Sequence, residues 1–315
     1  MTDTPTRTVT GPPAATGGPD GATGGPPAAA RGHRAPTVLD RRHAFRHALD
    51  AERAAGRTIG LVPTMGALHR GHVSLLERAA GEVDIVAMTL FVNPLQFGPR
   101  EDLATYPRDR AGDQQKAQQA GATYLFAPSQ EEMFPEPPAT SVSVAGLSSR
   151  LEGEHRPGHF QGVATIVTKL FSLAGPCRAY FGEKDYQQLM VIRRLVADLS
   201  LPVEIVPCPT IREPDGLALS SRNAYLTPGQ RETAPALYQA LLAGQREAQR
   251  TDDAAAVRGA MTARLARHPV LTLDYAEVAD AADLTPLTTL DNGARLLIAA
   301  RIGGTRLIDN LPAIP

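Results

Sequence analysis

Apolar positions follow two alternating patterns between residues 37 and 211. Apolar residues spaced three or four apart predict helices, and short runs of branched apolar residues predict buried strands. The helical segments are 38–56, 72–82, 109–121, 160–175 and 185–200, and the extended segments are 58–64, 83–93, 123–129, 178–184 and 203–211. Strands that are apolar throughout and alternate with helices indicate a parallel sheet covered on both faces. With right-handed crossovers, the predicted fold class is α/β with a doubly wound parallel sheet.

The pattern changes after residue 211. Two long helical segments, 231–249 and 252–268, come first, and two extended segments, 272–280 and 294–310, close the chain. Helices followed by strands without further alternation are typical of an α+β unit. We therefore expect a larger domain over residues 37–210 and a smaller C-terminal α+β domain over 211–315, with the boundary within about ten residues of 211.

Residues 1–36 differ from the rest in composition. They consist mainly of Gly, Pro, Ala and Thr, and Val9 is their only branched or aromatic apolar residue. Such a segment cannot bury enough apolar surface to offset the entropy lost on ordering, so a disordered tail is predicted. It lacks the continuous apolar core of a secretory signal and the Arg-rich amphipathic character of a mitochondrial presequence.

Composition excludes several classes of protein. The chain has 315 residues, 43% of them hydrophobic, and a formal net charge of -1, so no global positive field attracts nucleic acid or an anionic membrane. No apolar run reaches the ~18 residues of a membrane-spanning helix. Cys177 and Cys208 form no C-x-x-C pair, and buried reduced thiols in a cytosolic protein are favoured over a disulfide. Because the chain has no global positive field, any phosphate that it binds must be held by local groups.

The first candidate site follows the strand 58–64 and reads "PTMGALHRGH". No P-loop and no G-x-G-x-x-G motif occurs there, which argues against a P-loop kinase and a dehydrogenase. The turn instead contains Gly66 and Gly71 and opens a helix, whose first N–H groups attract anions. His69 and His72 can add N–H donors for phosphate. Two zinc ligands or a purely structural role are the alternatives.

Two further segments have the same character. "FGEKDYQQ" places Lys184 at the end of a strand and the start of a helix, where it can reach an anion, although a solvated pair with Asp185 is the alternative. "LALSSRNAYL" contributes Ser220, Ser221 and Arg222, which can bind a polyphosphate or simply cap a turn. In doubly wound sheets, ligands bind at the carboxyl ends of strands, where all three segments lie.

These motifs together resemble a known family. "PTMGALHRGH", "FVNPLQFG", "YPR", "EGEHRPGHFQGV", "FGEKDYQQ" and "DGLALSSRN" are similar, in order and approximate spacing, to the signature segments of the pantothenate synthetases, the pantoate–β-alanine ligases. The resemblance covers about residues 37–310 and implies a Rossmann-like nucleotidyltransferase domain. The H-x-G-H signature of that superfamily is present as His69-Arg70-Gly71-His72. Leu95 and Leu219 stand where many relatives have Met, a volume-conserving change.

The resemblance implies a two-step ligation. ATP and pantoate form pantoyl adenylate and pyrophosphate, and the amine of β-alanine then displaces AMP to give pantothenate. Mg²⁺ is expected with ATP, bound mostly by phosphate and water, with Asp113 and Asp185 as the candidate protein ligands. A cytoplasmic homodimer that associates through the larger domain is also implied. The smaller domain is expected to act as a lid that excludes water from the activated acyl group.

The resemblance also assigns residues to roles. His72, as proton donor, His69 and Lys184 are the expected catalytic residues. Gln96 and Gln188 are expected to bind the hydroxyls of pantoate, and Gln96 also β-alanine. Asn93, Tyr106, Arg156 and His159 are expected to frame the site. The expected ATP-binding residues are Met65, Gly66, Ala67, Leu68, His69, Arg70, Gly71, His72, Gly182, Glu183, Lys184, Asp185, Ile211, Leu219, Ser220, Ser221 and Arg222.

Two rival functions remain compatible with these motifs. One is an adenylyl or cytidylyl transferase that uses another acceptor, and Gln96 and Gln188 are the residues that would distinguish it. The other is a nucleotide-binding module without chemistry, for which replacing His72 would change nothing.

Overall fold

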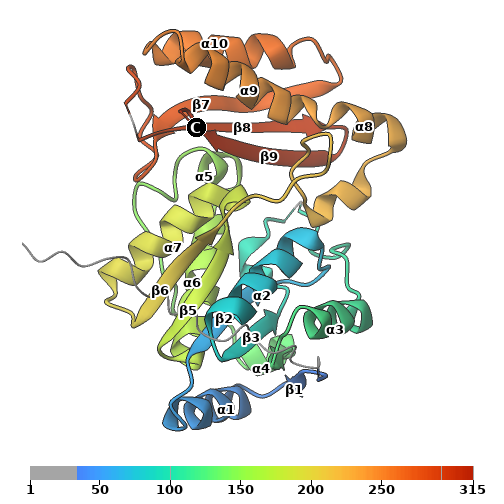
Figure 1. The fold of residues 1–315 in the computed structure, drawn as a ribbon, viewed down its shortest axis with the longest axis vertical. Helices are drawn as coiled ribbons and strands as arrows, with labels where there is room; N and C mark the ends of the chain where they lie inside the picture. Colours follow the sequence, from blue (N-terminus) through green and yellow to red (C-terminus); the bar gives the residue numbers. More distant parts are fainter. Residues whose placement is uncertain (1–33, 100, 292, 315) are drawn as a thin grey trace, which may run out of the picture. The chain divides into compact units, whose positions relative to one another are not determined.

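The computed structural model describes residues 34–99, 101–291 and 293–314, which belong to one compact unit. The tail predicted over residues 1–36 lies almost entirely outside the described residues. Six parallel strands form one sheet in the order β1-β4-β3-β2-β5-β6 (Figure 1). Their bounds are β1 Thr37–Leu39, β2 Ile59–Thr64, β3 Ile85–Leu90, β4 Tyr124–Phe126, β5 Cys177–Gly182 and β6 Val203–Cys208.

Helices cover both faces of this sheet. α1, α6 and α7 contribute to one apolar core, and α2 and α3 contribute to the other, so the predicted doubly wound α/β fold is confirmed. The α-helices here are α1 Arg42–Ala54, α2 Arg70–Glu82, α3 Arg110–Gln119, α4 Gln130–Met133, α5 Glu152–His155, α6 His159–Ala174 and α7 Tyr186–Asp198. Short 3₁₀ helices are η1 Pro94–Gln96, η2 Glu183–Asp185 and η3 Ser221–Tyr225.

Burial explains the strand sequences. In β3 the first five residues are buried, because helices cover both faces of this inner strand, and its sequence is accordingly apolar apart from Thr89. β6 lies at the edge of the sheet, and its exposure varies along the strand from buried Val203 to exposed Glu204. Pro207 in β6 is tolerated because an edge strand has one row of unpaired backbone groups.

A second, antiparallel sheet is formed by β7 Leu271–Asp280, β8 Ala294–Ile302 and β9 Thr305–Pro312 in that order. α9 Ala236–Ala248 and α10 Ala254–Leu265 pack on it around a separate apolar core, and the short α8 Pro228–Thr233 precedes them. The expected smaller α+β arrangement is therefore present. The domain boundary near residue 211 stays a prediction.

Three segments differ from the expected elements. The expected helix 231–249 is interrupted, because α8 ends at Thr233 and α9 begins only at Ala236, after Pro235. The expected helix 38–56 begins only at Arg42, because Thr37–Leu39 pairs with β4 as an edge strand, a tertiary contact that local periodicity does not reveal. The expected strand 294–310 is two strands, since Gly303 and Gly304 form a two-residue hairpin turn with Gly303 at φ 57°.

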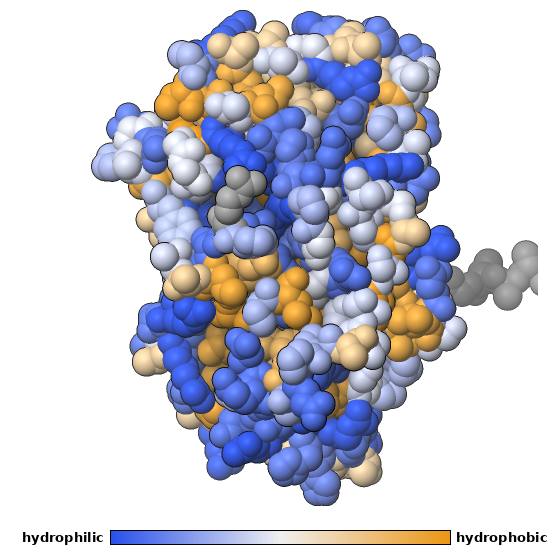
Figure 2. All heavy atoms as spheres, turned by 180° about the vertical axis from the view of Figure 1, so that it is seen from behind, coloured by the Kyte–Doolittle hydropathy of each residue, from blue (hydrophilic) through white to orange (hydrophobic). Residues whose placement is uncertain are grey.

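The surface carries few large apolar side chains. Among the described residues these are Val38, Leu199, Tyr225, Val270 and Ile314. On the face shown in Figure 2, hydrophilic residues predominate and apolar residues gather in separate patches. None of the described helices is both long and apolar enough to cross a membrane.

Candidate active site

A cavity opens at the carboxyl end of the parallel sheet, between β2 and β5. β2 pairs with β3 along its full length, but with β5 only at Gly60 and Leu61. Pro63, which has no N–H for a ladder hydrogen bond, lies in the part of β2 that diverges from β5. The strand order reverses at this point, and the divergent strand ends line the cavity. Ligands of doubly wound folds bind in such crevices.

The turn after β2 is held in an unusual conformation. Gly66 has φ 94° and Ala67 has φ 52°, both in the left-handed region. The buried Asp113 carboxylate on α3 accepts hydrogen bonds from the backbone N–H groups of Ala67 at 2.9 Å and Leu68 at 2.7 Å. This carboxylate stabilises the turn that leads into α2.

His69 and His72 lie at the start of α2 with ring centroids 4.1 Å apart. The His69 N–H donates to His72 Nδ1 at 3.4 Å, and the Gly71 N–H donates to His69 Nδ1 at 3.1 Å. Because each Nδ1 accepts, the ring proton of each neutral imidazole is on Nε2. Burial lowers the pKa of His69 to about 4 and that of His72 to about 3, helped by the Lys184 ammonium and by the other histidine, respectively. At neutral pH the cavity therefore receives two uncharged N–H donors.

Lys184 enters the cavity from the turn between β5 and α7. Its Nζ lies 3.4 Å from Asp185 Oδ1. The turn itself is held by β9, because Asn310 Nδ2 donates to the backbone oxygens of Glu183 and Lys184, each at 2.9 Å. Arg295 of β8 contacts the Glu183 carboxylate at 3.5 Å. Lys184 thus follows a strand of the first sheet, and its turn is held by two strands of the second sheet.

The Ser220–Arg222 segment completes the cavity. The Leu219 N–H donates to the Ile211 carbonyl at 3.0 Å, which closes the strand-like segment before it. Ser221 Oγ donates to the Ala67 carbonyl at 3.2 Å, so this segment contacts the turn that precedes the histidines. Arg222 forms two hydrogen bonds with the Asp102 carboxylate, at 3.2 and 2.9 Å.

Gln96 and Gln188 face the same cavity from η1 and α7. Asn93 Nδ2 donates to Gln96 Oε1 at 3.0 Å and to the Gly162 carbonyl at 3.1 Å. This contact orients the Gln96 amide and leaves its Nε2 group 3.3 Å from Met65 Sδ. A donor amide is therefore presented beside the histidine turn.

The structure brings most of the expected site residues together. Those that line the cavity are Met65, His69, Gly71, His72, Gln96, Gly182, Lys184, Asp185, Gln188, Ile211, Leu219, Ser220, Ser221 and Arg222, joined by the framing residues Asn93, Tyr106, Arg156 and His159. Gly66, Ala67, Leu68, Arg70 and Glu183 do not line it. Arg70 instead pairs with Glu77 at 2.6 Å. The remaining four support the two turns.

Sequence reasoning missed the acidic partners and the second-sheet contacts. Glu101 and Asp102, which pair with Arg156 and Arg222, lie between the "NPLQFG" and "YPR" motifs, and that proximity was their only signal. No sequence signal pointed to Asn310 or Arg295, because each contacts the Lys184 turn from a distant segment of the chain.

The residues present set limits on a metal site. Within the described part of the chain, no three His, Cys, Asp or Glu residues are grouped as metal ligands would be. The zinc alternative for His69 and His72 therefore has no support there. The Asp113 carboxylate already accepts hydrogen bonds from two backbone N–H groups and does not line the cavity, whereas the Asp185 carboxylate does. Of the two candidate carboxylates, Asp185 is therefore the one that could reach a hard cation bound mostly by phosphate and water.

Comparison with known proteins agrees with this geometry. The family model described as pantoate-beta-alanine ligase matches residues 37–312. Pantothenate synthetase of Rhizorhabdus wittichii is 54% identical over 84% of this chain and 93% of the relative, and that of Moorella thermoacetica is 51% identical over 85% and 95%.

Solved structures give the same result. The crystal structure of pantothenate synthetase from Thermus thermophilus has a TM-score of 0.85 at 50% identity, covering 89% of this chain and 100% of that one. The Francisella tularensis pantoate-beta-alanine ligase, described as complexed with beta-gamma ATP and beta-alanine, has a TM-score of 0.72 at 35% identity, covering 89% and 98%. The chain has a doubly wound sheet with this cavity, and the family model matches nearly all of its described residues. It therefore belongs to the pantoate–β-alanine ligase family.

Proposed function

We propose that the chain joins pantoate to β-alanine at the expense of ATP, through a pantoyl adenylate. The observation that carries this is the meeting of three groups in one cavity: the two histidines after β2, Lys184 after β5, and Ser220–Arg222 after β6. Each group supplies donors or positive charge suited to phosphate oxygens. The Francisella relative, described with an ATP compound and β-alanine, supports the same ligands here.

In the first step, a carboxylate oxygen of pantoate attacks the α-phosphorus of ATP. A bond forms between that oxygen and phosphorus, the bond to the bridging oxygen breaks, and pyrophosphate leaves. Because the carboxylate is already a nucleophile, no general base is required, and catalysis comes from alignment and charge stabilisation. The Nε2–H groups of His69 and His72, with Lys184 and Arg222, would donate to the α-phosphate and to pyrophosphate.

We infer that His72 acts as a hydrogen-bond donor and keeps its proton. Its Nδ1 already accepts from the His69 N–H, and burial lowers its pKa to about 3. A neutral imidazole donates a hydrogen bond readily but releases its remaining proton only with difficulty. This refines the proton-donor role that the resemblance implies.

In the second step, the unprotonated amine of β-alanine attacks the acyl carbon of the adenylate. A carbon–nitrogen bond forms, the bond from that carbon to the phosphate oxygen breaks, AMP leaves with the oxygen, and the amine loses one proton to solvent. Gln96 and Gln188 would hold the pantoate hydroxyls through their amides. Mg²⁺ would bind phosphate oxygens and, among the two candidate carboxylates, Asp185. We also expect a cytoplasmic enzyme that forms a homodimer through its larger domain, and both expectations rest on the family resemblance.

The first step can be tested alone. Pyrophosphate release should follow mixing of the protein with ATP, Mg²⁺ and pantoate in the absence of β-alanine. His72→Ala should slow this release by about 10²–10³-fold, as the loss of a transition-state donor does, while circular dichroism shows a folded chain. If folded wild-type protein releases no pyrophosphate, the acid substrate is wrong. If His72→Ala releases it at the wild-type rate, the assigned role is wrong.

The acid specificity has its own test. Gln96→Ala and Gln188→Ala should each raise the KM for pantoate about ten-fold or more, since a bound hydroxyl loses its partner. The KM for ATP should change less than about two-fold. Equal increases for both substrates would contradict the assignment and favour a transferase that uses another acceptor.

A further inference from the structure

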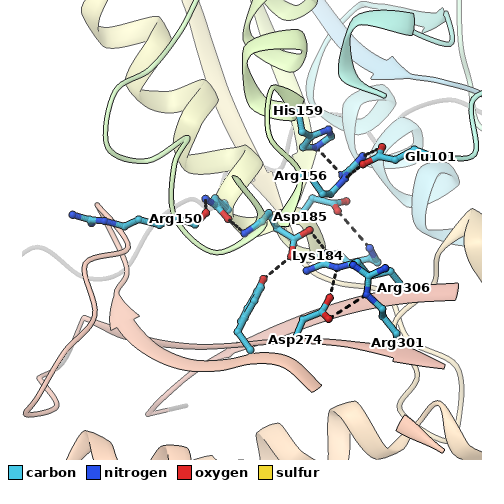
Figure 3. Close-up of polar contacts among 12 residues, drawn as sticks. Glu101, Arg150, Arg156, His159, Lys184, Asp185, Asp274, Arg301 and Arg306 are labelled. Carbon is cyan, nitrogen blue, oxygen red and sulfur yellow. Dashed lines mark hydrogen bonds and ion pairs between the residues drawn. The ribbon is translucent and has the colours of Figure 1, made fainter. Parts of the chain in front are cut away.

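A continuous series of hydrogen bonds runs from Glu101 to Gln96. The Glu101 carboxylate accepts from Arg156 Nε at 2.8 Å and from Arg156 Nη2 at 2.6 Å. Arg156 Nη1 lies 3.0 Å from His159 Nε2, and His159 Nδ1 lies 2.8 Å from the Gln96 carbonyl. Figure 3 shows Glu101, Arg156 and His159 in this order. The series starts outside the cavity, which Arg156, His159 and Gln96 line.

The direction of each hydrogen bond follows from the chemistry of the groups. A guanidinium has only donors, so Arg156 must donate to His159 Nε2. The ring proton of neutral His159 is therefore on Nδ1, and it donates to the Gln96 carbonyl. Burial lowers the pKa of His159 to about 4, helped by the Arg156 charge, so the ring is neutral at pH 7. A single tautomer of His159 is thus selected by Arg156.

Gln96 is held from two sides. His159 fixes its backbone carbonyl, and Asn93 fixes its side-chain oxygen. α6 also approaches η1 closely, since Asn93 donates to the Gly162 carbonyl. The remaining Gln96 donor group therefore points to a defined place. Its position depends on the His159 tautomer, which depends on the orientation of Arg156.

We propose that Glu101 is a positioning residue for the acid substrate: its carboxylate orients Arg156, which selects the His159 tautomer that holds Gln96. This rests on the proposed function, in which Gln96 binds pantoate. Glu101 itself does not line the cavity that holds Gln96 and His159. A two-point pair between a carboxylate and the guanidinium fork fixes both the position and the plane of Arg156.

Asp102 provides a matched control. It follows Glu101 directly, carries the same charge, and also forms a two-point pair with an arginine of the cavity, Arg222. Arg222 belongs to the group expected to bind phosphate. Glu101→Gln and Asp102→Asn therefore remove one charge each from the same segment. The first change acts on the residues proposed to bind pantoate, and the second acts on the residues proposed to bind ATP.

The kinetic test compares the two variants. Glu101→Gln should raise the KM for pantoate about ten-fold and leave the KM for ATP within about two-fold. Asp102→Asn should change the KM for ATP and leave the KM for pantoate within about two-fold. In an Arg156→Lys background, which lacks the planar fork, Glu101→Gln should add little. Equal pantoate effects in both variants, or an undiminished effect of Glu101→Gln in the Arg156→Lys background, would overturn the proposal.

A spectroscopic test needs no substrate. In protein labelled with ¹⁵N-histidine, the His159 ring, assigned by its loss in His159→Gln, should show a protonated Nδ1 and an unprotonated Nε2 at pH 7. Glu101→Gln should shift these signals toward the average of two tautomers, and Asp102→Asn should not. Unchanged His159 signals in Glu101→Gln would refute the positioning role. If wild-type protein fails to release pyrophosphate, only the proposed function falls, because the tautomer is read independently.

Discussion

At the scale of single residues, the site depends on neutral histidines whose tautomers are set by their neighbours. His69 and His72 accept at Nδ1 from backbone N–H groups and present Nε2–H to the cavity. His159 accepts at Nε2 from Arg156 and presents Nδ1–H to a carbonyl. One residue type thus presents an N–H donor to the cavity in two positions and supports a backbone carbonyl in a third, because different partners select different ring protons.

The buried His159 makes stability depend on pH. Its folded pKa is about 4, whereas an unfolded histidine titrates near 6.5, so between these values the unfolded chain binds more protons. The free energy of unfolding should therefore fall as pH decreases from about 6.5 to about 4, by about 1.4 kcal/mol per pH unit for this residue. Urea unfolding at several pH values in this window should show a shallower slope for His159→Gln. Parallel slopes for wild type and variant would contradict this.

At the scale of elements, the approach of α6 to η1 decides where Gln96 lies. A Cβ atom on Gly162 would lie 2.2 Å from the Leu95 carbonyl oxygen, well inside contact distance. Gly162→Ala should therefore push η1 away, lower the free energy of unfolding by about 2 kcal/mol or more, and raise the KM for pantoate more than that for ATP. Chemical denaturation and steady-state kinetics measure both effects.

Gly259 is the control for this prediction. It lies on an exposed face of α10, and a Cβ atom there would meet nothing within 4 Å. Gly259→Ala should stabilise the protein by about 0.5–1 kcal/mol, because alanine loses less backbone entropy in a helix. If Gly162→Ala is as stable as Gly259→Ala, the close approach does not exist in solution.

At the scale of the whole molecule, residues of the second sheet fix the position of site segments that follow strands of the first sheet. Asn310 on β9 fixes the turn that carries Lys184, and its neighbour Asp309 forms two hydrogen bonds with Arg212, at 2.6 and 2.8 Å, in the segment before Ser220. Two of the three groups proposed to bind phosphate therefore contact the C-terminal strands.

Asn310→Ala tests this dependence. The change removes the donors to the Glu183 and Lys184 carbonyls, so the turn should lose its fixed position and pyrophosphate release should fall about ten-fold. Arg301→Ala on β8, where the side chain is half exposed and pairs with Asp274, should keep the rate within about two-fold. Equal rates in the two variants would show that β9 does not position Lys184.

Much of the fold follows from local sequence. β3 is apolar apart from Thr89 because both of its faces are covered, and the turn that contains His69 supplies the glycines and N–H donors that open α2. Such features depend on residues close together in the chain, so periodicity and motif spacing reveal them. The same information placed His72, Lys184 and Arg222 at strand ends and led to the cavity that they share.

What the sequence by itself determined is therefore the alternation of helices and strands from α1 to β6 and the chemical character of each strand end. The tertiary structure alone decided that Thr37–Leu39 is an edge strand, that β2 and β5 diverge beyond Leu61, and that Glu101 pairs with Arg156. Each of these features depends on how segments far apart in the chain meet. The free energy of such a contact depends on the geometry of both segments, and the local sequence of neither segment encodes that geometry.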